Sequence, residues 1–134
     1  MIPEKAKASL EELFREVYGC RFIVLIDTKE LKSVLEFWGD SVKNRDRLRD
    51  ELIHILKYIV LDRQKNARNP FIRSALQDFK SLTFEMERGY VLFTATPLEN
   101  FVIASGITGD VGLGFWRASL SRVLEKLEDA ADKR

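Results

Sequence analysis

A glycine-rich segment between residues 106 and 114 is the part of the sequence that comes nearest to a nucleotide-binding motif. Gly106, Gly109, Gly112 and Gly114 lie between an apolar run and an amphipathic stretch, a context in which a loop can cradle phosphate. Their spacing fits neither the Walker loop nor the dinucleotide fingerprint, and the segment has no lysine to reach a phosphate. We therefore interpret the segment as a turn and expect no cofactor there.

The other residues with chemical potential do not combine into a recognisable site. His54 is the single histidine and falls on the polar face of an expected helix, so a metal site or a Ser-His-Asp unit lacks parts. Cys20 is the single cysteine, which excludes an intramolecular disulfide and a cysteine-based zinc site. Glu85 and Glu87 fit ordinary alternation on a half-exposed strand better than a catalytic carboxylate pair. We expect no catalytic residue, no metal and no enzyme activity.

The composition favours one globular domain over residues 1–134. The chain is 46% hydrophobic and 32% charged, which suits a single core with a solvated surface. Its 22 basic and 21 acidic residues nearly cancel, and this balance argues against a nucleic-acid partner; the basic run 43–49 is better explained as the solvated start of a helix. No signal peptide or apolar run of membrane-spanning length is apparent, so we expect a cytoplasmic protein without a membrane partner.

Hydrophobic periodicity predicts an α+β domain with three helices and five strands. Apolar residues recur at helical spacing over 3–18, over 45–65 and in a final helix after Gly114. Strands are expected at 21–27, 33–38, 80–88, 90–96 and 101–105, with a connector at 66–78. The first and last of these strands are apolar on both faces, so we expect them to be central and covered on both sides.

Two of these elements carry more apolar surface than one core requires. In strand 80–88, one set of alternating residues is apolar, as in a half-exposed or edge strand: Leu82, Phe84 and Met86. Helix 45–65 has a core stripe that further apolar residues widen on one flank. The stripe is Leu48, Leu52, Ile55 and Ile59, and the flank is Ile53, Leu56 and Val60. One core-facing stripe covers little more than ~100° of a helix, so the excess predicts a second partner.

Two stretches of the C-terminal half, together with the order of the elements, resemble the roadblock/dynein light chain family, a relative of the longin and profilin-like folds. The first is Leu82-Thr83-Phe84-Glu85-Met86-Glu87-Arg88-Gly89-Tyr90, a strand followed by a glycine turn. The second is Asp110-Val111-Gly112-Leu113-Gly114-Phe115-Trp116-Arg117, the approach to the last helix. Two features depart from the family pattern: the first hairpin turn, 27–30, lacks glycine, and the connector is longer than usual.

The resemblance implies a three-layer fold, with a five-stranded antiparallel sheet between the second helix on one face and the other two helices on the opposite face. It also implies a homodimer in which strand 80–88 pairs with its copy and the second helices pack together. The expected dimer-interface residues are Ile53, Leu56, Val60, Leu82, Phe84 and Met86. Which flank of the second helix faces the second copy stays open.

The function that the resemblance implies is a non-enzymatic platform that binds and regulates a small Ras-like GTPase. The expected partner-binding residues lie on the exposed side of the second helix: Arg47, Asp50, Glu51, His54, Lys57, Tyr58 and Leu61. Arg45 or Arg49 is a candidate for an arginine finger toward the nucleotide. Two alternatives stay open at this point: a structural adaptor of the dynein light chain type and a small-ligand sensor of the profilin or PAS type.

Overall fold

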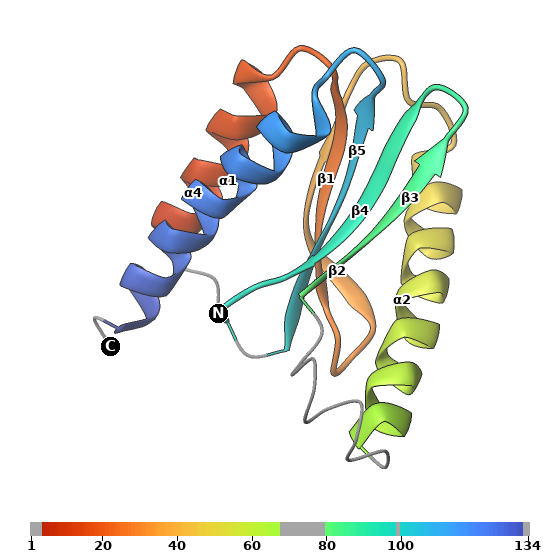
Figure 1. Ribbon diagram of the computed structural model, residues 1–134, viewed down its shortest axis with the longest axis vertical. Coiled ribbons are helices and arrows are strands. Elements are labelled where there is room, and N and C mark those ends of the chain that lie inside the picture. Colours follow the sequence, from red (N-terminus) through yellow and green to blue (C-terminus); the bar gives the residue numbers. More distant parts are fainter. Residues whose placement is uncertain (1–3, 68–79, 99, 133–134) are drawn as a thin grey trace.

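The computed structural model describes the backbone of residues 4–67, 80–98 and 100–132, and the side chains of these residues except 59–67 and 129–132. Within these ranges the helices and strands follow in the predicted order, α-β-β-α-β-β-β-α (Figure 1). They are α1 (Glu4–Glu16), β1 (Cys20–Asp27), β2 (Lys32–Trp38), α2 (Arg45–Ala67), β3 (Ser81–Met86), β4 (Gly89–Ala95), β5 (Phe101–Thr108) and α4 (Leu113–Asp132). The connector beyond Ala67 lies outside the described residues. No described helix is long and apolar enough to cross a membrane.

The five strands form one antiparallel sheet in the order β2-β1-β5-β4-β3, which confirms the predicted fold class. The two strands expected to be central, β1 and β5, are indeed flanked on both sides. Residues 22–26 of β1 are all buried, because alternate side chains enter different cores on the two faces. The sheet therefore has two edges, β2 and β3.

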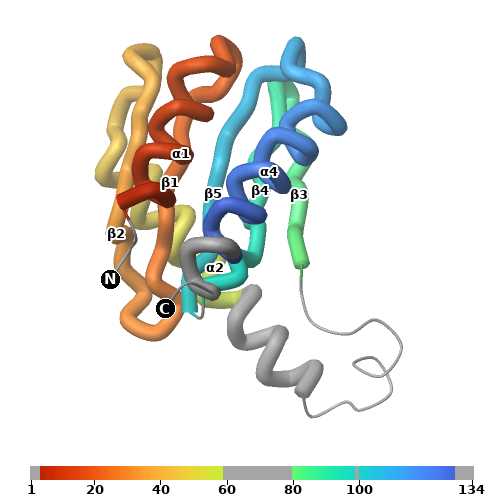
Figure 2. The backbone as a smooth tube through the Cα atoms, turned by 90° about the vertical axis from the view of Figure 1, so that its left-hand side faces the viewer, coloured from red at the N-terminus to blue at the C-terminus, as the bar shows by residue number. Residues whose placement is uncertain are grey.

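The helices cover the two faces of the sheet as the resemblance implied. On one face α1 and α4 pack side by side over a core that includes Leu10, Ile23, Ile103 and Trp116 (Figures 1 and 2). On the other face α2 is the one described helix that packs onto a smaller core, which includes Phe22, Val24, Phe93 and Val102. Within the larger core the Trp116 indole N–H donates to the Ser105 hydroxyl at 3.0 Å, so its one polar atom is satisfied.

Strand β5 differs from the prediction, which ended it at Ser105 and assigned Gly106 to a loop. The strand continues to Thr108, and Gly106 pairs with Phe22 on one side and Val91 on the other. Glycine is required there because the Phe22 ring lies across it: a Cβ on Gly106 would stand 2.2 Å from Phe22 Cε1. The glycine is a packing site within the strand, and only the later glycines belong to the loop.

The first hairpin turn closes without the glycine that the family pattern led us to look for. The Asp27 carboxylate accepts hydrogen bonds from the backbone N–H of Lys29 at 2.8 Å and of Glu30 at 3.2 Å. This side-chain turn replaces part of the backbone bonding that a tight glycine turn provides. Leu31 takes the left-handed conformation, with φ 55°, that glycine would occupy more easily.

Candidate functional site

The edge strand β3 exposes an apolar row on the same side of the sheet as α2. Leu82 and Phe84 are each 37% exposed, and Met86 is 57% exposed. Their register partners across the ladder include Phe93 and Val91, which belong to the core under α2, so the row continues that core outward to the edge. Phe84 packs edge-on against Phe93, with ring centroids 6.1 Å apart. Three large apolar side chains thus line an edge that no other described strand covers.

The backbone of β3 has one hydrogen-bonding side that pairs with no other described strand. Met86 and Gly89 close a two-residue hairpin, and the Lys80 carbonyl accepts a bond from Ala95 N–H at 2.9 Å. In an antiparallel ladder the bonded pairs alternate, so the backbone groups of 80, 82, 84 and 86 point toward β4. The N–H and C=O groups of Ser81, Thr83 and Glu85 therefore point away from the sheet.

Helix α2 supplies the second part of the surface, and its contacts correct one predicted site residue. Leu52 and Leu56 are 2% and 1% exposed, because they pack into the core between α2 and the sheet. Leu56 was expected at a dimer interface, but its side chain is buried within the protomer and has no exposed surface for a partner to contact. Ile53 is half-buried at the margin of the same core, and Val60 lies outside the described side chains.

The outward face of α2 brings together the predicted partner-binding residues whose side chains are described. All are exposed: Arg47, Asp50, Glu51, His54, Lys57 and Tyr58. Tyr58 is 62% exposed and packs at a right angle against His54, with ring centroids 5.1 Å apart. Arg47 forms an ion pair with Glu51 at 3.6 Å. Leu61, the seventh predicted residue, lies outside the described side chains.

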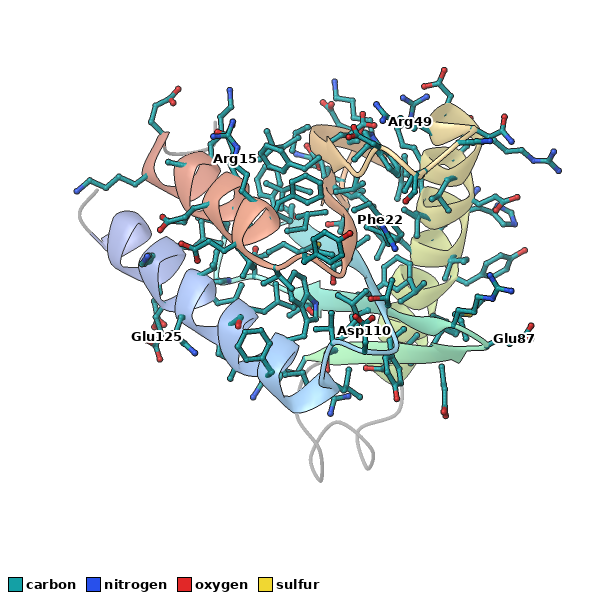
Figure 3. All side chains as sticks on the ribbon, turned by 90° about the horizontal axis from the view of Figure 1, so that it is seen from above. Arg15, Phe22, Arg49, Glu87, Asp110 and Glu125 are labelled. Atoms are coloured by element: carbon teal, nitrogen blue, oxygen red, sulfur yellow. The ribbon has the colours of Figure 1, made fainter. Side chains whose placement is uncertain are left out.

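The two arginines proposed as a finger are already held by their own chain. Arg45 donates to the Gly39 and Val42 carbonyls, both at 3.3 Å. Arg49 is bonded to Asp46 at 3.1 Å and lies within ion-pair distance of two further carboxylates, one of them Glu36 on β2 (Figure 3). An arginine finger would have to break these bonds, so their geometry favours a role in fastening the start of α2 to the protomer.

The loop that follows β5 is held by hydrogen bonds of its own polar groups. The Thr108 hydroxyl donates to the Asp110 carboxylate, and this hydrogen bond lowers the pKa of Asp110. The Gly109 N–H is also engaged, since it donates to the Arg88 carbonyl at 2.8 Å. A carboxylate held in its ionised form repels phosphate, which supports interpreting the loop as a turn.

Cys20 is buried and far from reactive. Burial raises the pKa of its thiol to about 12, and the thiol donates a hydrogen bond to the Phe22 carbonyl at 3.6 Å. A thiol with this pKa is almost wholly protonated at neutral pH and is a poor nucleophile. In the described part of the chain, no three His, Cys, Asp or Glu side chains cluster as a metal site would require.

A groove with a volume of about 340 Å³ lies between α4 and β3, on the face opposite α2. Lys80 and Arg117 stand on its rim, and Leu92 and Leu120 lie among its lining residues. Arg117 reaches across to β3, where its guanidinium donates to the Thr83 hydroxyl at 2.9 Å. Neither cation could be assigned to a site from the sequence, because the two are 37 positions apart along the chain (117 − 80) and the fold brings them together.

Comparison with known proteins relates this fold to solved structures. No protein-family model and no curated protein matches the sequence. MglB from Myxococcus xanthus is 13% identical and superposes over 98% of both chains, with a TM-score of 0.74. A structure described as MglB with a tetrameric arrangement is 20% identical over 97% of this chain and 90% of the other, with a TM-score of 0.71. A Roadblock/LC7 domain from Streptomyces avermitilis is 10% identical over 93% and 96%, with a TM-score of 0.63. The chain therefore has the roadblock/LC7 fold.

Proposed function

We propose that this protein is a non-enzymatic platform that forms a homodimer and binds a small Ras-like GTPase, in the cytoplasm. The observation that carries the proposal is the presence of two exposed surfaces on one side of the sheet. The apolar row of β3 stands at an open edge, and the outward face of α2 presents mixed charges beside Tyr58. The roadblock/LC7 fold and the family resemblance in the sequence support the same function.

The homodimer follows from the chemistry of the β3 edge. An uncovered edge with large apolar side chains is an aggregation hazard unless a partner covers it, and a second copy of the same strand is a self-complementary partner. Pairing across a two-fold axis perpendicular to the sheet would join the two sheets edge to edge. The solved neighbour described as tetrameric supports self-association through this fold.

The GTPase-binding surface follows from how such a dimer places α2. Both second helices would lie on the same side of the joined sheet, so their exposed faces would form one surface. Aromatic residues beside charged residues suit a transient interface, in which the aromatic anchors and the charges steer the encounter. Lys57 and Tyr58 are exposed on this face, so both are available for these roles.

Two measurements test the proposal in turn. Multi-angle light scattering between about 5 and 500 µM should show a dimer; a protein that stays monomeric throughout contradicts the proposal. Calorimetric titration with a Ras-like GTPase, loaded with GDP or with a GTP analogue, should then show binding to the dimer.

Matched variants locate the surface. Lys57→Glu and Tyr58→Ala should each weaken GTPase binding by about tenfold without dissolving the dimer. Lys126→Glu, which makes the same charge change on exposed α4, should leave binding unchanged. If the intact dimer ignores the cognate GTPase in both nucleotide states, GTPase regulation is wrong and the structural adaptor is the function that remains.

The proposal also requires that the isolated protein neither bind nor hydrolyse nucleotide. Calorimetry with GTP and with ATP in magnesium buffer should detect no heat of binding. Micromolar affinity for either nucleotide would revive the glycine loop that follows β5 as a phosphate site and overturn the non-enzymatic assignment.

A further inference from the structure

We propose that the second copy pairs with β3 in one defined register, with Thr83 opposite its own copy, and that Arg117 of each subunit holds Glu85 of the other. This inference rests on the proposed homodimer and deepens it. It assigns Arg117 and Glu85, outside both predicted interface sets, as the residues that select and align the partner.

The backbone of β3 limits the possible registers. Residues directly opposite each other in an antiparallel pair project on the same face of the sheet. A two-fold axis perpendicular to the sheet therefore passes between a residue and its own copy. The registers to compare centre this axis on Leu82, on Thr83 or on Phe84. Within β3 as described, Ser81–Met86, the backbone groups that point outward are those of Ser81, Thr83 and Glu85. The registers differ in how many of these groups find partners within the strand.

The Thr83-centred register satisfies all three residues. Thr83 meets its copy, and Ser81 meets the second copy's Glu85 on each side of the axis, which yields about six backbone hydrogen bonds at two per pair. The Leu82-centred register carries Glu85 past Ser81, where β3 begins, and the Phe84-centred register leaves Ser81 opposite Glu87, beyond the end of β3.

The side chains on the α2 face favour the same register. It places Leu82 opposite the second copy's Phe84, at a non-bonded pair where side chains approach most closely. Both residues are 37% exposed in the protomer and would bury their apolar surface against each other. The Leu82-centred register would instead set Lys80 opposite Phe84.

The charges on the α4 face discriminate further. Arg117 is exposed and bonded to Thr83, and within the described residues it forms no ion pair. Glu85 is also exposed and has no ion-pair partner among those residues.

In the Thr83-centred register the second copy's Glu85 lies beside Ser81, on the rim of the groove that Lys80 and Arg117 line. It would be one pairing step from Thr83 and within reach of the Arg117 guanidinium. The Phe84-centred register would place the two Glu85 carboxylates diagonally across the axis, where they repel.

Cysteine cross-linking shows which residue of β3 lies opposite its own copy and so determines the register. Opposite residues in a bonded antiparallel pair have Cα atoms about 5.5 Å apart, and those in a non-bonded pair about 4.5 Å apart, both within the disulfide range. Thr83→Cys should therefore give a cross-linked dimer on mild oxidation, whereas Leu82→Cys and Phe84→Cys should give little. The native Cys20 is 5% exposed and supplies a low background, for which the unmodified chain is the control.

The outcomes separate the register from the dimer. If light scattering shows a dimer and Phe84→Cys or Leu82→Cys cross-links in place of Thr83→Cys, this register is wrong and the homodimer stands. If none of the three variants cross-links and light scattering shows a monomer, the proposed homodimer is wrong and the register proposal that rests on it is wrong as well.

Charge exchange tests the cross-subunit pair. Arg117→Glu and Glu85→Arg should each weaken the dimer by about tenfold, because each change acts at two symmetric places. The double variant should restore the dimerisation constant to within about threefold of the original. Arg122→Glu and Glu87→Arg are matched controls that reverse exposed charges on the same helix and beside the same strand. Equal losses in the controls, or no rescue in the double variant, would remove the assignment.

Discussion

Replacing Gly106 with alanine is the sharpest test of how the α2 face of the sheet is packed. In an open strand position this change stabilises a protein by about 0.4–1 kcal/mol, because alanine has fewer conformations to lose on folding. Here the new Cβ would lie 2.2 Å from Phe22 Cε1, 2.7 Å from Cζ and 2.8 Å from Cδ1. The sign of the effect therefore depends on whether the Phe22 ring can move.

The surroundings of the ring hold it in place. Phe22 is 5% exposed, belongs to the core under α2 and packs against Trp38, with ring centroids 5.6 Å apart. To reach an ordinary carbon–carbon contact of about 3.5 Å the ring must shift by roughly 1.3 Å. Overpacking of this kind costs about 1–3 kcal/mol. After the entropic gain is subtracted, Gly106→Ala should lower the free energy of unfolding by about 1–2 kcal/mol.

Urea unfolding followed by circular dichroism, at one fixed protomer concentration, measures this difference. Gly114→Ala is the matched control, because no atom lies within 4 Å of a Cβ added there and the residue is in the first turn of α4. It should stabilise the protein by about 0.4–1 kcal/mol. In the Phe22→Leu background, which removes the ring, Gly106→Ala should be nearly neutral. A neutral or stabilising Gly106→Ala in the unmodified protein would refute this account of the packing.

Three further predictions follow from burial and pKa. Phe84→Glu should raise the dimer dissociation constant at least about hundredfold and lower protomer stability by about 1–2 kcal/mol, because its contact with Phe93 is lost while the protomer stays folded. Leu56→Glu should instead unfold the protomer, as circular dichroism and light scattering would report. Ser105→Ala should cost about 1–3 kcal/mol in urea unfolding by stranding the buried Trp116 N–H, and a smaller loss would indicate that water reaches that site. Burial raises the Cys20 pKa from 9.0 to about 12. The contribution of the protonated thiol to stability is therefore complete below pH 9 and falls by up to about 1.4 kcal/mol per pH unit between pH 9 and 12. The difference in stability between the unmodified protein and Cys20→Ala should change in that window alone.

Local patterns predicted those parts of the fold in which neighbouring residues share one environment. Residues 22–26 are apolar at every position, and the structure places them in a central strand buried on both faces. The alternation of Leu82, Phe84 and Met86 likewise identified an edge strand with one apolar face. The apolar spacing after Gly114 predicted the last helix, and Trp116 in its first turn is fully buried.

The misjudged positions depend on contacts between distant segments. Gly106 looked like a loop residue because its reason for being glycine is the Phe22 ring, on another strand. Leu56 was assigned to the dimer interface because periodicity alone could not say which flank of α2 the sheet covers. Arg49 was a candidate arginine finger because the sequence does not show that Glu36, on β2, lies within ion-pair distance of it.

The two edges of the sheet are unequal, and this inequality bounds how far assembly can proceed. The pairing of edge strand β2 with β1 shifts register between Leu25 and Ile26 of β1. Lys32, at the start of β2, forms an ion pair with Glu30 at 2.7 Å. Irregularity and charge of this kind deter a further strand from adding. A chain with two receptive edges would polymerise into an open-ended fibre, since each added copy would leave another edge to extend. In the proposed homodimer β3 would be the one receptive edge among the described strands, so pairing would occupy the site that permits growth and assembly through the sheet would close at two subunits.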